Sequence, residues 1–205
     1  MGFMIEVRQT AEFSRWLRRL KDANAVARIV ARIRRMEQGN LGDSRSLGAG
    51  LMEMRIDYGP RYRVYYVHRG ATIVIPVVCW RQAHTAARYQ AGPGNGGEAV
   101  MLKTTRFDAA DYLHSEERQA AYITAALETG DAAFVRDALG VVARARGMAQ
   151  VAKRADLNRE SLYKALGATG NPEFGTVMRV MRALDLTLAA RPADAKRTAR
   201  KRRAA

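Results

Sequence analysis

A chain of 205 residues with a net charge of +15 can hold one large or two small domains. Its composition, 48% hydrophobic and 27% charged, is typical of a soluble folded protein. The longest apolar run, 73–80, is far shorter than the roughly 20 residues that cross a bilayer. The single cysteine excludes an internal disulfide framework, and the first residues show no signal segment. We therefore expect a cytoplasmic protein that does not contact a membrane.

The positive charge is unevenly distributed. Residues 1–90 contain 16 basic and 7 acidic residues, and 15 of the basic ones are arginine. Residues 91–190 contain 12 of each, and residues 191–205 contain 7 basic and one acidic. Because a guanidinium binds phosphate through two donors, the first block favours an anionic partner, although the arginine bias of a GC-rich genome would look the same. The tail is poor in apolar residues, so we expect it to be disordered and to add non-specific nucleic-acid affinity.

The first elements predict a strand followed by a helical hairpin. Residues 3–8 are typical of a strand, and Thr10 can cap a helix whose apolar residues follow helical spacing to Leu20. Asn24 can cap a second helix that ends at Gly39. One face of this second helix is apolar, with Val26, Ile29, Val30, Ile33 and Met36. The other face carries Arg28, Arg32 and Arg35.

From Leu51 the hydrophobic period changes to two, which predicts strands. Residues 51–57 and 61–66 alternate on either side of the turn sequence Tyr-Gly-Pro at 58–60, and Gly70 leads into an apolar strand over 72–78. The predicted order of residues 1–79 is therefore β-α-α-β-β-β. This is an α+β domain in which a helical hairpin packs on a small, mostly antiparallel sheet.

This order, with LMEMRIDYGPRYRVYYVHRG at 51–70, resembles the RelE/ParE superfamily of toxins, in particular the HigB-like addiction module killer branch. The resemblance covers residues 4 to about 79. The branch carries a Glu-x-Arg strand, a turn with Gly-Pro and a Tyr-Arg-Val-Tyr strand, and it usually has glycine where this chain has Arg61. The resemblance implies RNA cleavage on the ribosome or, in the ParE branch, gyrase poisoning.

Several residues of these strands suit RNA cleavage. Attack by the RNA's own 2′-OH needs a base, cations on the phosphate and an acid for the leaving oxygen. The candidate catalytic residues are Arg55, Arg61, Arg63 and Tyr65. The arginines could clamp a phosphate, and Tyr65 or Tyr66 could stack on a base or transfer a proton. In the alternative interpretation the arginines belong to a solvated strand face and pair with Glu53 and Asp57.

Other polar residues give weaker signals. His68 can titrate near neutrality, but its place late on a strand fits a surface or core role better. The histidines at 68, 84 and 114 and Cys79 lack the spacing of metal ligands, and the glycines at 92–97 lack the Lys-Ser/Thr ending of a phosphate loop. We expect neither a metal nor a cofactor.

The junction at 80–100 departs from the toxin branch. There the last strand runs into a Gly-Gly-Asp-Lys-Ser-x-Gln motif and a closing helix, whereas this chain reads WRQAHT at 80–85. The missing motif predicts impaired toxin activity. The glycine and proline at 92–97 favour a flexible linker. Alternatively, codons for this stretch read one base later can encode the missing motif and a stop overlapping Met101, so the junction would be an out-of-frame toxin tail.

Residues 101–190 predict an all-α domain. Helices are expected to begin at Asp108 and to span 116–128, and a third helix is capped by Asp131 and ends at Gly147. The next segment, MAQVAKRADLNRESLYKALG at 148–167, predicts two short helices joined by a tight turn. Asp156 takes the left-handed position there, and Asn158 caps the second helix. A last helix is expected over 174–184.

This segment is a helix-turn-helix and resembles the Xre/Cro-type domain of HigA-like antitoxins, over about 101–190. The resemblance implies that the second helix enters the major groove of operator DNA. It assigns as DNA contacts Asn158, Arg159, Glu160, Ser161, Tyr163 and Lys164. Met148 stands where many relatives have glutamine. The alternative is a helical hairpin that only contacts protein.

The sequence thus predicts a type II toxin–antitoxin fusion with a toxin domain at 1–79, a linker at 80–100, an antitoxin domain at 101–190 and a basic tail at 191–205. The antitoxin half is expected to repress its own operator and to neutralise the toxin half, in cis or in trans. It is also expected to form the contact of a homodimer, because such domains bind palindromic sites as dimers. The alternative is an active ribosome-dependent endoribonuclease that cleaves mRNA, or a gyrase poison, held in check in cis.

Overall fold

The computed structural model describes residues 5–48, 50–69, 72–75, 103–190 and 192. The predicted linker, Cys79, His84 and nearly all of the basic tail lie outside these residues. The strands are β1 Glu6–Thr10, β2 Ser44–Gly48, β3 Leu51–Ile56, β4 Tyr62–Arg69, β5 Thr72–Ile75 and β6 Thr104–Arg106. The helices are α1 Ala11–Arg19, α2 Ala23–Glu37, the 3₁₀ helix η3 Ala109–Tyr112, α4 Glu116–Leu127, α5 Ala132–Arg146, α6 Met148–Arg154, α7 Arg159–Leu166 and α8 Phe174–Ala183.

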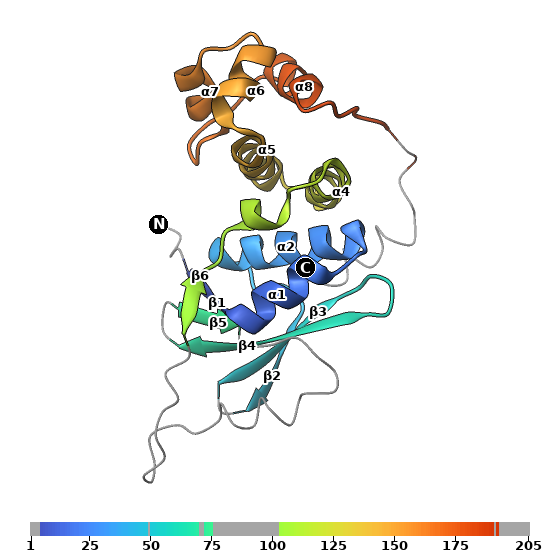
Figure 1. Cartoon of the computed structure of the whole chain (residues 1–205), viewed down its shortest axis with the longest axis vertical. Helices are drawn as coiled ribbons and strands as arrows, with labels where there is room; N and C mark the ends of the chain where they lie inside the picture. Colours follow the sequence, from blue (N-terminus) through green and yellow to red (C-terminus); the bar gives the residue numbers. More distant parts are fainter. Residues whose placement is uncertain (1–4, 49, 70–71, 76–102, 191, 193–205) are drawn as a thin grey trace.

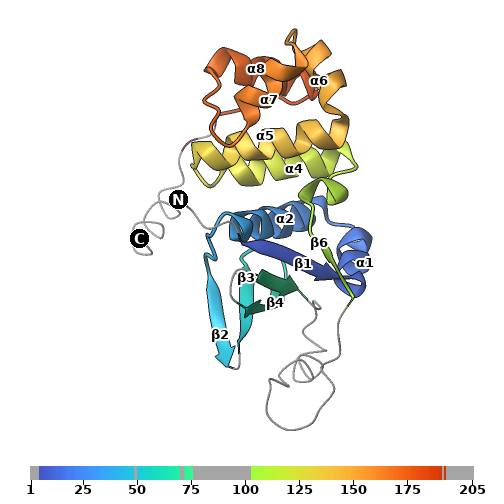
Figure 2. The ribbon, with the colours of Figure 1, turned by 90° about the vertical axis from the view of Figure 1, so that its left-hand side faces the viewer.

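The described strands form one mixed sheet in the order β2-β3-β4-β5-β1-β6. β1 and β5 are parallel, and the other neighbours are antiparallel. Helices α1 and α2 lie over one face of the sheet, α4 and α5 lie above α2, and α6, α7 and α8 form the far end of the molecule (Figures 1 and 2). The protein is therefore of mixed α/β class, with its helical elements stacked on one side of the sheet.

The predicted order β-α-α-β-β-β is present, with two strands added. β2 was not predicted because SRSLG lacks β-branched residues. β6 comes from the C-terminal half, which was expected to be all-α, and it pairs with the edge of β1 through the register Gln9↔Thr105. Three residues are too few for a periodic signal, so only the neighbouring strand reveals this element.

The caps of the first two helices give one confirmation and one correction. Thr10 caps α1 as predicted, because its side chain accepts a hydrogen bond from the backbone N–H of Phe13 at 3.3 Å. The prediction of Asn24 as the cap of α2 is wrong. Asp22 holds that position, and its Oδ1 accepts from the N–H of Ala25 at 3.0 Å. The helix therefore begins one residue before Asn24, which lies exposed in its first turn.

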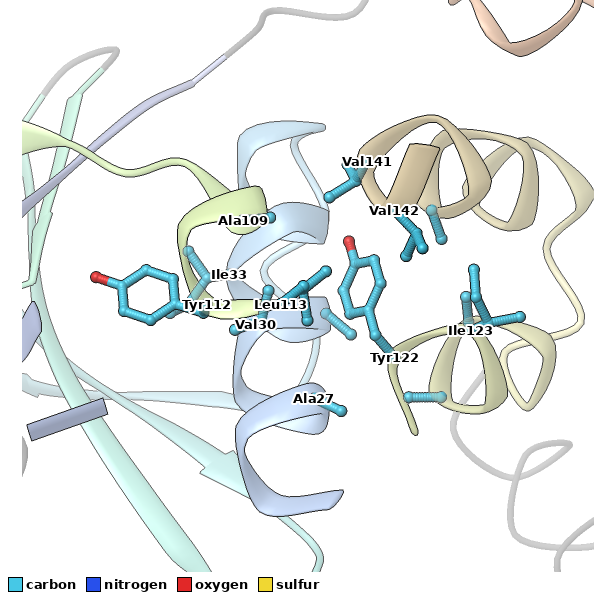
Figure 3. Packing of buried hydrophobic residues seen from close by; sticks show 14 of the residues in the cluster. Ala27, Val30, Ile33, Ala109, Tyr112, Leu113, Tyr122, Ile123, Val141 and Val142 are labelled. Atoms are coloured by element: carbon cyan, nitrogen blue, oxygen red, sulfur yellow. The ribbon is translucent and has the colours of Figure 1, made fainter. Parts of the chain in front are cut away.

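Helix α2 is buried on two sides. The predicted apolar face is fully buried against the sheet layer, as expected. The opposite side is covered by α4, where Ala27 and Ala31 are also buried. Figure 3 shows Ala27 pointing toward the C-terminal helices, with Leu113 and Tyr122 filling the space between them. A single cluster of buried residues runs from β1 to the C-terminal helices, so the two halves share one hydrophobic core.

The arginines of α2 therefore do not form a solvated face. The Nη2 of Arg28 lies 2.8 Å from a carboxylate oxygen of Glu128 at the end of α4. Arg35 stacks 5.7 Å from the ring centroid of Phe134 in α5, and Arg32 donates to the carbonyl of Leu41 at 3.1 Å. Arg28 and Arg35 therefore contact residues of the C-terminal half, whereas Arg32 contacts the loop that follows α2.

Candidate functional sites

Helices α6 and α7 form the predicted pair of short helices with a tight turn between them. Asp156 has a φ of 53°, so it occupies the left-handed position as expected. The Oδ1 of Asn158 accepts from the N–H of Ser161 at 2.6 Å and thereby caps α7. The apolar side chains of the two helices are buried, namely Val151, Ala152, Leu162 and Leu166, and Leu157 in the turn is partly buried.

All six predicted DNA contacts are exposed around the first turns of α7: Asn158, Arg159, Glu160, Ser161, Tyr163 and Lys164. The guanidinium of Arg159 lies 5.5 Å from the ring centroid of Tyr163, one turn along. Lys153 and Arg154 add positive charge at the end of α6. Helix α7 lies at the end of the molecule opposite the sheet (Figure 1). A large partner can therefore reach the exposed side of α7 without contacting the sheet layer.

Long-range contacts that the sequence did not predict hold this pair of helices in place. Arg136 of α5 donates to the carbonyls of Gly170 and Ala168, at 2.6 and 2.7 Å, just beyond α7. Asp185 follows α8 and binds Arg154 through two hydrogen bonds, of 2.5 and 2.9 Å. The Arg154 guanidinium lowers the pKa of Asp185 by hydrogen bonding. α5 thus holds the loop that follows α7, and Asp185 holds α6, which packs against α7.

Two of the three arginine candidates of the N-terminal half lie around one carboxylate. Arg55 and Arg63 are opposite each other on β3 and β4. The Oε1 of Glu53 accepts from Arg55 at 2.7 Å, and its Oε2 accepts from Arg63 at 3.3 Å. Glu53 is only 5% exposed and raises the pKa of Arg55. Of the two interpretations of these arginines, pairing with Glu53 is the arrangement present here.

The tyrosine and histidine candidates separate in space. Tyr65 is opposite Glu53 in the register of β3 and β4, and it is 8% exposed. Tyr66, its neighbour in sequence, is fully buried, so it is not available to stack on a base. His68 is half-buried late on β4. Only Tyr65 therefore joins the arginine face.

Arg61 lies in the turn between β3 and β4, apart from the other arginines. Its φ is 58°, in the left-handed region that favours glycine. A glycine would adopt this backbone conformation without strain. The structure thus brings together Arg55, Arg63 and Tyr65, and it does not place Arg61 on their strands.

The contact between the two halves contains buried polar groups that sequence reasoning missed. Arg34 of α2 binds both carboxylate oxygens of Asp137 in α5, at 2.6 and 2.8 Å, and Glu37 at 2.7 Å. Its partner Asp137 raises the pKa of Arg34, chiefly by hydrogen bonding, and burial raises the pKa of Glu37. Tyr112 is fully buried and binds Ser14 of α1. Arg118 is 8% exposed and binds the carbonyl of Leu20, just after α1. No sequence pattern near these residues predicts that their partners lie about 100 positions away.

Within the described part of the chain, no helix is long and apolar enough to cross a membrane. Among the same residues, no group of three histidine, cysteine, aspartate or glutamate side chains is arranged to hold a metal ion.

These features define a mixed α/β protein whose helical half packs on a sheet layer and exposes one short helix at its far end. Residues 103–192 match a protein family described as "Probable addiction module antidote protein". Two proteins of Haemophilus influenzae, both described only as uncharacterized, are similar. One is 50% identical over 80 residues, which are 39% of this chain and 82% of the relative. The other is 44% identical over 71 residues, which are 35% and 72%.

The chain belongs to this family of addiction module antidotes through its C-terminal half. No solved structure is detectably similar. Membership assigns the chain a role in a toxin–antitoxin system, and an antidote implies a toxin as its partner. The predicted antitoxin character of residues 101–190 is thereby supported at the level of the family.

Proposed function

We propose that the chain is a toxin–antitoxin fusion whose C-terminal half binds operator DNA through α7 as an autorepressor. The observation that carries this proposal is the exposure of every candidate contact on a capped helix, whose following loop is bound by Arg136 of α5. In a helix-turn-helix the start of the second helix reads base edges in the major groove. Two copies, paired through their antidote halves, would read a palindromic operator.

Binding of the full-length protein to DNA from upstream of its own coding sequence tests this proposal. We expect substitution of Arg159 and Lys164 by alanine to weaken binding at least about tenfold, since contacts of this kind contribute about 1–3 kcal/mol each. The matched control replaces Arg15 and Arg19, two exposed arginines of α1, and removes the same charge at the opposite end of the molecule. The control should change affinity less than about twofold.

Two results would contradict the proposal. If the wild-type protein shows no salt-sensitive binding to this DNA, α7 is not an operator-reading helix and the pair of helices serves only protein contact. If the α1 control weakens binding as much as the α7 variant, the interaction is a general effect of positive charge. Fluorescence anisotropy at two salt concentrations distinguishes these cases.

The N-terminal half is proposed to be a toxin-like domain that the antidote half restrains. The antidote half packs β6 against the edge of β1 and α4 against α2, which joins the two halves over a continuous core. We propose in addition that this toxin-like domain is impaired as an mRNA interferase. Glu53 already occupies Arg55 and Arg63, and the segment 80–85 lacks the motif of the toxin branch.

Expression of residues 1–100 alone in bacteria tests the impairment. We expect these cells to grow like cells with an empty vector, because the arginines that would hold a phosphate are bound to Glu53. A fragment with Arg55 and Arg63 replaced by glutamine serves as the control and should behave identically. Growth arrest with mRNA cleavage that the control abolishes would instead assign an active endoribonuclease, and arrest with DNA breaks would assign a gyrase poison.

A further inference from the structure

The surface that joins the halves is mostly apolar. Helix α2 meets α4 and the end of η3 through apolar side chains, among them Ala27, Leu113 and the ring of Tyr122 (Figure 3). Apolar contacts of this kind tolerate related partners, because no group is left unsatisfied when the shape changes slightly. A buried polar group is more selective, because a partner that cannot bind it leaves it desolvated and unpaired. Selectivity should therefore lie in the buried polar contacts.

Tyr112 of the antidote half makes such a contact. Its ring is fully buried, stacks on Phe107 at 5.4 Å between centroids and lies under the guanidinium of Arg18. Its hydroxyl donates to the side-chain carbonyl of Gln9, which is 3% exposed at the end of β1, and lies 3.0 Å from the hydroxyl of Ser14 in α1. Neither side of this contact can turn to water without opening the interface.

Arg118 makes a second contact with the same part of the N-terminal half. Its guanidinium donates to the carbonyls of Leu20 and Arg18, at 2.7 and 3.2 Å, where α1 ends. The last carbonyls of a helix have no partner within the helix and carry partial negative charge, so they suit a buried cation. Arg118 is only 8% exposed, and this burial lowers its pKa. Tyr112 therefore contacts the end of β1 and Ser14 of α1, and Arg118 contacts the C-terminal end of α1.

We propose that Tyr112 and Arg118 are the residues by which the antidote half selects its toxin partner, with Gln9 as the matching residue on the other side. The partner class is a toxin-like domain, in this chain or in a separate one, that has an amide at the end of its first strand and a hydroxyl five residues later. This inference rests on the proposed function. It deepens that function by naming the residues that determine the pairing.

A double-mutant cycle in the full-length protein tests the proposal. A protease site is introduced between residues 80 and 100, the folded chain is cleaved there, and the affinity of the two pieces is measured. We expect Tyr112→Phe and Gln9→Leu each to weaken association about tenfold, because each removes the buried hydrogen bond between the Tyr112 hydroxyl and the Gln9 side chain. The double variant should return to within about threefold of wild type, because both sides are then apolar.

Two further variants complete the experiment. Arg118→Met should weaken association at least as much as either single variant, because the carbonyls of Arg18 and Leu20 lose their donor. Glu128→Gln, at the more exposed ion pair with Arg28, is the control and should change affinity less than about threefold. Urea unfolding of the uncleaved variants gives the same cycle if a cleaved variant does not stay folded.

The outcomes separate this inference from the proposed function. If the wild-type pieces separate after cleavage at micromolar concentration, the restraining contact itself fails. If they stay together but the double variant is as weak as both single effects combined, the halves associate without selection through Gln9 and Tyr112. That second result overturns only this inference. Binding of DNA by α7 is unaffected in either case.

Discussion

Replacing Arg34 by methionine is expected to lower the free energy of unfolding by about 3 kcal/mol at pH 7. Arg34 joins the halves, because its guanidinium binds Asp137 of α5 and Glu37 of α2 in three hydrogen bonds. Methionine keeps much of the packing volume but has no donor. It leaves a carboxylate that is 7% exposed, that of Glu37, without its cation. Removing one partner of a buried pair typically costs 3–5 kcal/mol, against at most about 1 kcal/mol on the surface.

The stability lost in Arg34→Met should depend on pH, and the loss should become smaller as the pH falls. Burial already raises the pKa of Glu37, and Arg34 opposes that rise by hydrogen bonding and charge. Without Arg34 the pKa rises further, so the folded state binds a proton that the unfolded state releases. An acid with a raised folded pKa gains stability as the pH falls through that pKa. The deficit of Arg34→Met should therefore shrink from pH 7 toward the ordinary carboxylate value of 4.5.

Urea unfolding at several pH values measures both effects. The matched control is Arg28→Met on the same helix, which breaks the more exposed pair with Glu128 and should cost no more than about 1 kcal/mol. Equal losses for the two variants, or a deficit that stays constant with pH, would show that the Arg34 cluster does not carry this part of the interface.

The sequence predicted these helix ends and this turn well, because each is determined by residues that are close together in the chain. Thr10, Asp131 and Asn158 are caps whose acceptors reach N–H groups two or three residues ahead. The left-handed Asp156 follows from a tight turn with a residue that tolerates it. Where two neighbouring residues can both cap, local sequence does not choose between them. Asp22 and Asn24 are such a case, and the structure uses Asp22.

The sequence did not predict the contacts between the halves because their partners are about 100 residues apart. A helix with Arg28, Arg32 and Arg35 on one side looks solvated until α4 and α5 cover it. Likewise, β6 forms because it pairs with β1, and Arg118 is buried because it binds the end of α1. The exposed side of helix α7 could be predicted from the sequence. The contacts of Arg136 and Arg154 that hold the neighbouring segments could not.

Replacing Ala27 by leucine is expected to force α2 and α4 apart. Ala27 is fully buried and points toward the C-terminal helices (Figure 3), and α2 packs against α4. Leucine adds three carbon atoms where a methyl group fills the space. Such overpacking typically costs 1–3 kcal/mol, and we expect the upper end, about 3 kcal/mol, because both helices are also fixed on their other sides.

The form of the unfolding curve gives the stronger test. Since one buried cluster spans both halves, the wild-type protein should unfold in a single calorimetric transition. The Ala27→Leu variant should lose this cooperativity of unfolding and show two calorimetric transitions, one for each half. Ala11→Leu, the same change at an exposed position of α1, is the control and should stay within about 0.5 kcal/mol of wild type. Two transitions in the wild-type protein would show that the halves are energetically independent.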